Sequence, residues 1–163
     1  MFSLILIDQF LSNNLLTTEV KNSICAPSMI CSTGDGIKLF SIADINNVSG
    51  CEGYGDFTNL TANLIPGNTY PLTITTGYGN QNVTVWIDFN NDNDFTADEK
   101  IVTNFIIAPG QGSGSYTDTA ILTVPANIPA GQSHRLRFKS NWQAPVPNDA
   151  CELTQYGETE DYT

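Results

Sequence analysis

Short segments of alternating apolar and polar residues recur along this chain from Ile24 onward. Turn-forming residues separate them roughly every eight to twelve residues. No stretch repeats its apolar residues with the helical period of about 3.6. The pattern therefore predicts an all-β protein, an antiparallel β-sandwich of the jelly-roll or immunoglobulin-like type. Its strands are expected at 37–43, 70–76, 83–89, 101–107, 116–124 and 134–139.

The length and charge of the chain limit its domain count and its partners. Its 163 residues amount to about one domain, and 24–163 contain no linker or internal repeat. Six Lys and Arg stand against 17 Asp and Glu, which gives a net charge of −11. Nucleic acid and anionic lipid are excluded as expected partners, because both favour clustered Lys and Arg. A Lys-poor surface rich in Asn, Thr, Ser and Gly is typical of a secreted or cell-surface β protein.

Residues 1–23 form an apolar N-terminal extension. The run 2–11 is too short to span a bilayer as a helix, which takes about 20 apolar residues. It also fits a signal peptide poorly, since no basic residue precedes it, Asp8 interrupts it and no small-residue cleavage site follows. Two interpretations stay open: a strand or linker packed on its own domain, or a strand donated to the sheet edge of another copy.

An even number of cysteines in such a chain predicts two disulfides and an oxidising compartment. The cysteines are Cys25, Cys31, Cys51 and Cys151. Three pairings are possible. We favour Cys25–Cys31, which closes a short loop around Pro27, and Cys51–Cys151, which ties the beginning of the domain to its end. Zinc is disfavoured because the spacing contains no C-x₂-C pair.

Oxygen-bearing side chains recur at alternate positions directly after the segment 83–87. They follow the ligand register of an EF-hand loop, with a glutamate at its last position, and they are Asp88, Asn90, Asp92, Asp94, Thr96 and Glu99. Ca²⁺ prefers about six to eight hard oxygen ligands, so the segment predicts a Ca²⁺ site. Asp98 lies outside the register. The alternative is a solvated acidic turn without a metal.

The chain ends in Gly-Glu-Thr-Glu-Asp-Tyr-Thr at 157–163, which resembles the G-E-V-E-D-Y-T signature of the GEVED domain family. Segments within 50–58, 64–70, 85–90 and 124–137 resemble further motifs of that family, so the resemblance covers roughly 24–163. It implies a non-catalytic β-sandwich module of secreted or surface bacterial proteins, usually appended to proteases, glycan-degrading enzymes or adhesins. Members usually continue a few residues beyond the signature. We therefore expect the last strand to be cut short or completed by another segment.

The signature places three acids close together near the C-terminus. On a strand, Glu158 and Glu160 share one face and Asp161 takes the other. Arg135 and Arg137 also share a strand face, so we expect carboxylate–guanidinium pairing between the two sets. The alternative is that the acids complete the Ca²⁺ shell or hold a second metal.

The chain contains no G-x-S-x-G motif and a single histidine, so no catalysis is expected. Exposed aromatic residues could instead stack on sugar rings, and the candidates are Trp142 in a polar loop, Tyr78 in a glycine-flanked turn, and Tyr54, for which a core position is the alternative. We predict an extracellular, Ca²⁺-stabilised binding or adhesion module with a glycan or a protein surface as partner. The alternative is a structural subunit of a filament, whose copies join through the donated N-terminal strand.

Overall fold

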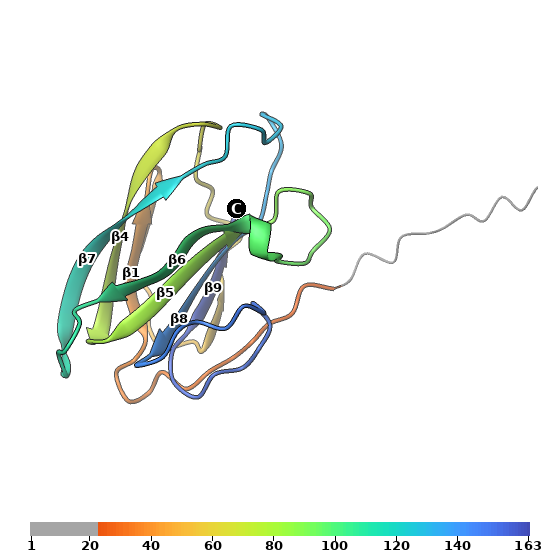
Figure 1. The fold of residues 1–163 in the computed structure, drawn as a ribbon. Coiled ribbons are helices and arrows are strands. Elements are labelled where there is room, and N and C mark those ends of the chain that lie inside the picture. The colour runs from red at the N-terminus through yellow and green to blue at the C-terminus, as the bar shows by residue number, and fades with distance from the viewer. Residues whose placement is uncertain (1–22) are drawn as a thin grey trace, which may run out of the picture.

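The structure is a computed structural model that describes residues 23–163, and it is all-β as predicted (Figure 1). The elements of this part of the chain are β1 (Ile37–Ile42), β2 (Ile45–Asn47), β3 (Tyr54–Asp56), β4 (Thr69–Tyr78), β5 (Gln81–Ile87), the short 3-10 helix η1 (Ala97–Glu99), β6 (Lys100–Ile107), β7 (Ser113–Thr123), β8 (Leu136–Trp142) and β9 (Thr159–Tyr162).

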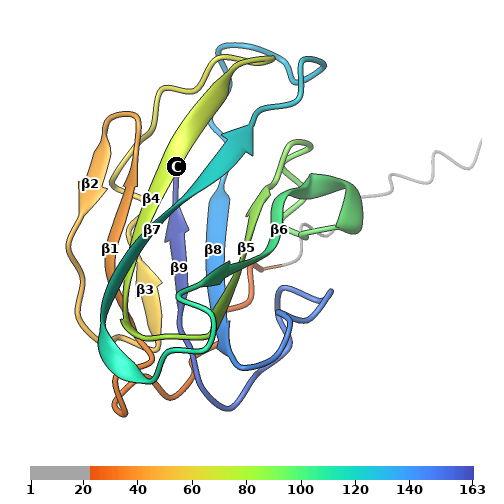
Figure 2. The ribbon, with the colours of Figure 1, turned by 60° about the vertical axis from the view of Figure 1, so that its left-hand side comes forward.

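The strands form two sheets that face each other as a sandwich (Figure 2). One sheet has the order β2-β1-β4-β7, and the other has the order β3-β9-β8-β5-β6. Neighbouring strands pair antiparallel, with the exception of β3 and β9, which run parallel. The β-sandwich prediction is confirmed.

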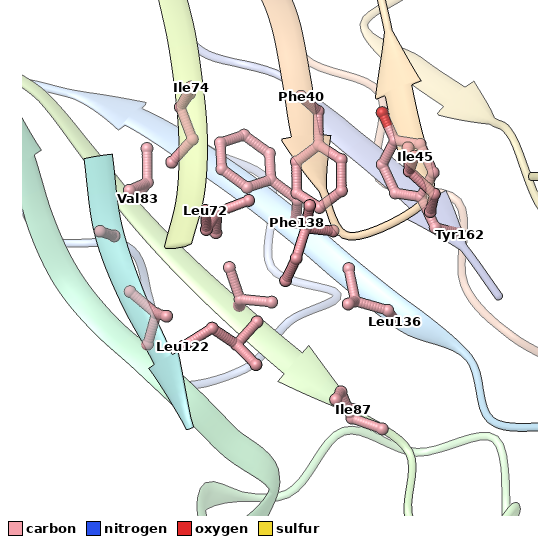
Figure 3. Close-up of a cluster of buried hydrophobic side chains, with 14 of the residues drawn as sticks. Phe40, Ile45, Leu72, Ile74, Val83, Ile87, Leu122, Leu136, Phe138 and Tyr162 are labelled. Carbon is pink, nitrogen blue, oxygen red and sulfur yellow. The ribbon is translucent and has the colours of Figure 1, made fainter. Parts of the chain in front are cut away.

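The main core lies between the two sheets (Figure 3). Phe40 of β1 stacks on Tyr162 of β9 with ring centroids 4.3 Å apart, and it meets Phe138 of β8 edge-on at 5.4 Å. Aliphatic residues such as Leu72 and Val83 fill the space beside them and are fully buried. Each such side chain contributes about 1.5–3 kcal/mol when it leaves water.

Strand β5 is buried along its whole length, on both faces. Val83 and Val85 point into the core between the sheets. Trp86 points outward and packs in a second cluster with Phe95, Val146 and Ala150, which come from two loops that cover the outer face of this sheet. Because the outer face is covered, polar and charged residues on it are also buried, and they need partners.

The prediction of six longer strands is accurate to a few residues at each end, whereas β2 and β3 were not predicted. Each has three residues, which is too few for the alternation of apolar and polar side chains to be read. The last strand, β9, has four residues and lies between β3 and β8.

The two predicted disulfides are present, but the predicted pairing is wrong. Cys25 pairs with Cys151, and Cys31 pairs with Cys51. The favoured Cys25–Cys31 bond assumed that 24–31 folds back on itself. This segment instead runs extended beside later parts of the chain: the N–H of Met29 donates to the carbonyl of Gly53, and Ile30 bridges Tyr156.

The predicted extension 1–23, and with it the proposed donated strand, falls almost entirely outside the described residues. Within the described part of the chain, no helix is long and apolar enough to cross a membrane.

The two disulfides should differ in their effect on stability. Cys25–Cys151 spans 126 residues and Cys31–Cys51 spans 20. In the chain-entropy model these loops correspond to about 5 and about 3 kcal/mol. We expect the C25S/C151S variant to lose more free energy of unfolding than C31S/C51S in urea denaturation. Non-reducing peptide mapping that finds Cys25 linked to Cys31 would contradict the assignment.

Candidate functional site

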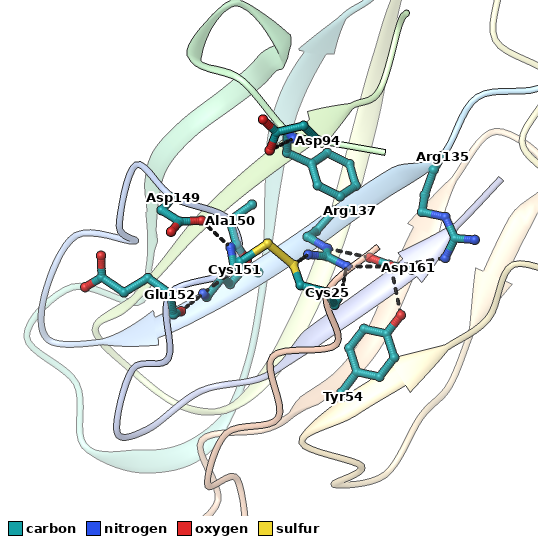
Figure 4. Close-up of a disulfide and its surroundings, with 12 residues drawn as sticks. Cys25, Tyr54, Asp94, Arg135, Arg137, Asp149, Ala150, Cys151, Glu152 and Asp161 are labelled. Atoms are coloured by element: carbon teal, nitrogen blue, oxygen red, sulfur yellow. Dashed lines mark hydrogen bonds and ion pairs between the residues drawn. A yellow bond between two sulfur atoms is a disulfide. The ribbon is translucent and has the colours of Figure 1, made fainter. Parts of the chain in front are cut away.

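A buried ion pair lies at the centre of the outer face of the sheet that contains β8 and β9 (Figure 4). Arg137 and Asp161 are direct cross-strand neighbours, and both side chains are fully buried. Arg137 Nε donates to Asp161 Oδ1 at 2.7 Å, and Nη2 donates to Oδ2 at 2.8 Å. This two-bond geometry is the strongest form of carboxylate–guanidinium contact.

The remaining polar atoms of this pair are also satisfied. Asp161 Oδ2 accepts the hydroxyl of Tyr54 at 2.9 Å and Arg135 Nη1 at 3.3 Å. Arg137 Nη2 donates to the carbonyl of Cys25 at 2.6 Å. The guanidinium also lies 4.5 Å from the ring centroid of Phe95, within cation–π range. The pair therefore joins β3, β8, β9, the Cys25–Cys151 disulfide and the loop after β5.

Tyr54, a predicted ligand-binding aromatic residue, belongs to this cluster. Burial and the nearby Asp161 carboxylate raise the pKa of Tyr54 to about 12. Its hydroxyl therefore stays protonated and donates to Asp161 at neutral pH. Tyr54 does not line the aromatic pocket described below.

Glu158 and Glu160 do not pair with arginine, so for them the predicted charge pairing is wrong. Glu160 points to the opposite face of β9 from Asp161, Glu158 lies just before this strand, and the two ion pairs of the described residues both involve Asp161. Glu158 accepts backbone N–H groups from Ile37 at 2.8 Å, Glu52 at 2.7 Å and Gly53 at 3.0 Å. Glu160 Oε2 accepts the hydroxyl of Tyr162 at 2.6 Å.

The six predicted Ca²⁺ ligands lie in one curled loop between β5 and β6. Asp88 is buried at its start, where Oδ1 accepts the N–H of Asp92 at 3.2 Å and Oδ2 accepts that of Asn93 at 3.1 Å. Asn91 and Asn93 have left-handed backbone, with φ of 57° and 69°. Asn tolerates this conformation better than other non-glycine residues, which allows the chain to curl.

Glu99 closes the other end of the loop and is also buried. Its Oε1 accepts the N–H of Phe89 at 3.0 Å, and its Oε2 accepts the N–H of Thr96 at 2.8 Å. Thr96 and Glu99 form a capping box on η1. The first and last predicted ligands are therefore fixed by backbone contacts.

The predicted ligands in the middle of the loop are exposed, and their oxygens do not converge on one point. Asn90 Oδ1 accepts the N–H of Asp92 at 2.9 Å, and Asp92 Oδ1 accepts that of Asp94 at 2.8 Å. In residues 23–163, no three loop carboxylates offer oxygens within 4.8 Å of one another. The donor set has the hard oxygen chemistry that Ca²⁺ requires, but the exposed Asp92 and Asp94 side chains must turn inward toward Asp88 to surround an ion.

Three aromatic side chains line a small pocket of about 180 Å³ where β4 and β8 end. Tyr78 meets Trp142 edge-on with ring centroids 5.4 Å apart, and Tyr156 meets the same indole at 5.8 Å. The predicted residues Trp142 and Tyr78 therefore lie together, although they are 64 positions apart in the sequence.

The same pocket contains polar groups. Asp35 is 3% exposed, and it accepts a hydrogen bond from the hydroxyl of Thr33. Trp142 Nε1 is buried and has no hydrogen-bond partner. An aromatic wall beside a carboxylate acceptor can hold a ligand that is apolar on one face and carries hydroxyl groups at its edge.

Sequence reasoning missed Tyr156, Asp35 and Thr33. Tyr156 joins the pocket because the segment before β9 returns beside the end of β8, where the N–H of Trp142 donates to the carbonyl of Tyr156 at 3.2 Å. Its position directly before the C-terminal signature could have marked Tyr156 as a candidate. Nothing in the sequence pointed to Asp35 or Thr33.

A larger cavity of about 640 Å³ opens at the other end of the sandwich. Its lining includes the first residue of β8, Leu136, whereas the aromatic pocket includes the last, Trp142. The lining combines aliphatic residues with several uncharged polar ones, and His134 is its one ionisable side chain. His134 Nδ1 already contacts the carbonyl of Asp88 at 3.0 Å. This cavity lacks the combination of three aromatic rings and a carboxylate that the aromatic pocket has.

Removal of Arg137 should be far more damaging than removal of Arg135. Arg137→Met leaves the fully buried Asp161 without its main partner, so we expect a loss of about 3–5 kcal/mol in the free energy of unfolding. Arg135 is 28% exposed and makes one longer contact, so Arg135→Met should lose less than about 1 kcal/mol. Urea denaturation measures both. Equal losses would show that the buried pair is not the dominant contact of this face.

Comparison with known proteins gives one match. The family model described as the GEVED domain matches residues 82–163, which is half of the chain. This stretch begins in β5 and contains the loop 88–99, both arginines, Trp142 and the C-terminal signature. No curated protein and no solved structure matches the chain. The chain belongs to the GEVED domain family.

Proposed function

We propose that this protein is a non-catalytic extracellular module that binds carbohydrate in the aromatic pocket formed by Thr33, Asp35, Tyr78, Trp142 and Tyr156. The observation that supports the proposal most is the convergence of three aromatic rings and a carboxylate at one place. A sugar offers an apolar face to an aromatic ring and hydroxyl groups to polar partners.

The size and charge of the pocket limit the kinds of ligand that can bind in it. Ligand pockets of drug-sized molecules measure about 300–1,000 Å³. At about 180 Å³, this pocket suits a single sugar unit, such as the end of a chain. Asp35 and the net charge of −11 repel anionic groups, which favours a neutral sugar.

The pocket supports binding over hydrolysis. Glycoside hydrolysis commonly uses two carboxylic side chains, one on each side of the scissile bond. Asp35 is the one carboxylate that lines this pocket. An extracellular location is supported by the two disulfides, which form and persist in oxidising compartments.

Loss of the aromatic rings should abolish carbohydrate binding. We expect Trp142→Ala and Tyr156→Ala to lose binding on an array of neutral oligosaccharides, because each removes one wall of the pocket. Ile121→Ala is the matched control, since Ile121 is 63% exposed and lies on β7, outside the pocket. Circular dichroism checks that each variant is folded. Unchanged binding by both folded pocket variants would refute the assignment of the site.

We also propose that Ca²⁺ stabilises the module through the loop 88–99. The support is the ligand register together with the fixed positions of its first and last members, Asp88 and Glu99. A bound ion would draw the exposed Asp92 and Asp94 toward these two anchors.

The loop proposal predicts a thermal shift on addition of Ca²⁺ that depends on the anchors. Excess Ca²⁺ should raise the melting temperature of the wild type, and D88N/E99Q should show a smaller rise, because it lacks the loop ligands and binding to the folded state alone is stabilising. Asp98→Asn is the matched control, since Asp98 lies in the same loop but outside the register. A rise of equal size in D88N/E99Q would place the stabilising ion elsewhere.

A further inference from the structure

Three glutamates meet between β1 and β9, away from the loop 88–99. Glu52, Glu158 and Glu160 each offer a carboxylate oxygen, and these three atoms lie within 4.8 Å of one another. Glu158 and Glu160 are fully buried, whereas Glu52 is exposed at the mouth of the cluster. Glu52 follows Cys51, and the Cys31–Cys51 disulfide fixes this part of the chain.

This glutamate cluster has no cationic partner. Both ion pairs of residues 23–163 are made by Asp161 on the opposite face of β9. Carboxylates this close repel one another, and burial removes the water that would screen them. The negative charge of the cluster therefore needs a proton or a cation nearby.

One buried atom of the cluster lacks any partner. Glu160 Oε2 accepts the hydroxyl of Tyr162, but Glu160 Oε1 accepts no hydrogen bond and is out of contact with solvent, since the nearby Ser49 hydroxyl donates to the carbonyl of Ile37 at 3.1 Å instead. Both oxygens of Glu158, in contrast, accept backbone N–H groups. An unpartnered buried carboxylate oxygen is costly, so its presence inside the cluster points to a ligand.

We infer that Glu52, Glu158 and Glu160 bind a second divalent cation, Ca²⁺, between β1 and β9. Two oxygens on one Ca²⁺ are separated by at most about twice the metal–oxygen distance of 2.3–2.6 Å, and the three glutamates meet this limit. Their donors are all hard oxygens, with no nitrogen or sulfur ligand in the cluster. Water can enter beside the exposed Glu52 and complete the coordination shell.

A proton is the competing occupant. Burial raises the pKa of Glu160 to about 7, so near neutral pH a proton and an ion compete for this carboxylate. A proton on Glu160 would neutralise one acid only. Burial raises the pKa of Glu158 to about 7 as well, against the three N–H groups that favour its ionised form, and Glu52 adds a third carboxylate at the entrance. A divalent ion compensates this arrangement more fully.

The test counts Ca²⁺ ions per chain by isothermal titration calorimetry in a background that lacks the loop site. The D88N/E99Q variant should still bind one Ca²⁺. Adding Glu52→Gln to it should weaken that binding at least about tenfold, because it removes one of three anionic ligands. Glu52 is exposed, so this change should not prevent folding. Glu152→Gln in the same background is the matched control, since Glu152 is exposed and outside the cluster.

Two results would overturn the inference. The first is that folded D88N/E99Q binds no Ca²⁺. The other is residual binding with the same affinity with and without Glu52→Gln, which would place the ion elsewhere. Neither result bears on carbohydrate binding at the aromatic pocket, so the two proposals fail or succeed separately.

Discussion

The buried pair of Arg137 and Asp161 is the contact on which the outer face of the larger sheet depends. It joins β8 to β9. Asp161 accepts a hydrogen bond from the hydroxyl of Tyr54 in β3, and Arg137 donates one to the carbonyl of Cys25 near the start of the described chain. Desolvation of both charges is offset because their polar atoms have partners. Phe95 then covers the guanidinium and brings the loop 88–99 against the sheet. Segments that are far apart in the sequence thus meet at one cation.

Strand β9 explains why the family signature is so acidic. Its side chains alternate between two environments: Asp161 faces the arginines, while Glu160 and Tyr162 face inward. Tyr162 stacks on Phe40 in the core and also donates its hydroxyl to Glu160. Glu158, just before the strand, accepts hydrogen bonds from the backbone N–H groups of Ile37, Glu52 and Gly53. The signature therefore links both sheets of the sandwich, and its inward acids are the ones left without a basic partner.

The sequence allowed the long strands to be predicted because each is long enough to show alternation, as in 83–89. It did not allow β2 and β3 to be predicted, since three residues show no period. The disulfide pairing failed because it depends on the path of 24–36, which is set by contacts with Gly53 and Tyr156. The pairing of Asp161 with arginine followed from strand faces, whereas the meeting of Glu52 with Glu158 and Glu160 depends on topology. Trp142 and Tyr78 could be singled out by residue type, but Asp35 could not.

If the aromatic pocket binds a neutral sugar, the indole N–H resonances of the protein report the binding directly. The chain has two tryptophans: Trp86 is fully buried in the second cluster, and Trp142 lines the pocket. In a titration with neutral mono- and oligosaccharides followed by two-dimensional ¹H–¹⁵N NMR, we expect the Trp142 Nε1–H signal to shift and the Trp86 signal to stay in place. If no sugar moves the Trp142 signal, or if both indole signals move alike, the aromatic pocket is not a carbohydrate site.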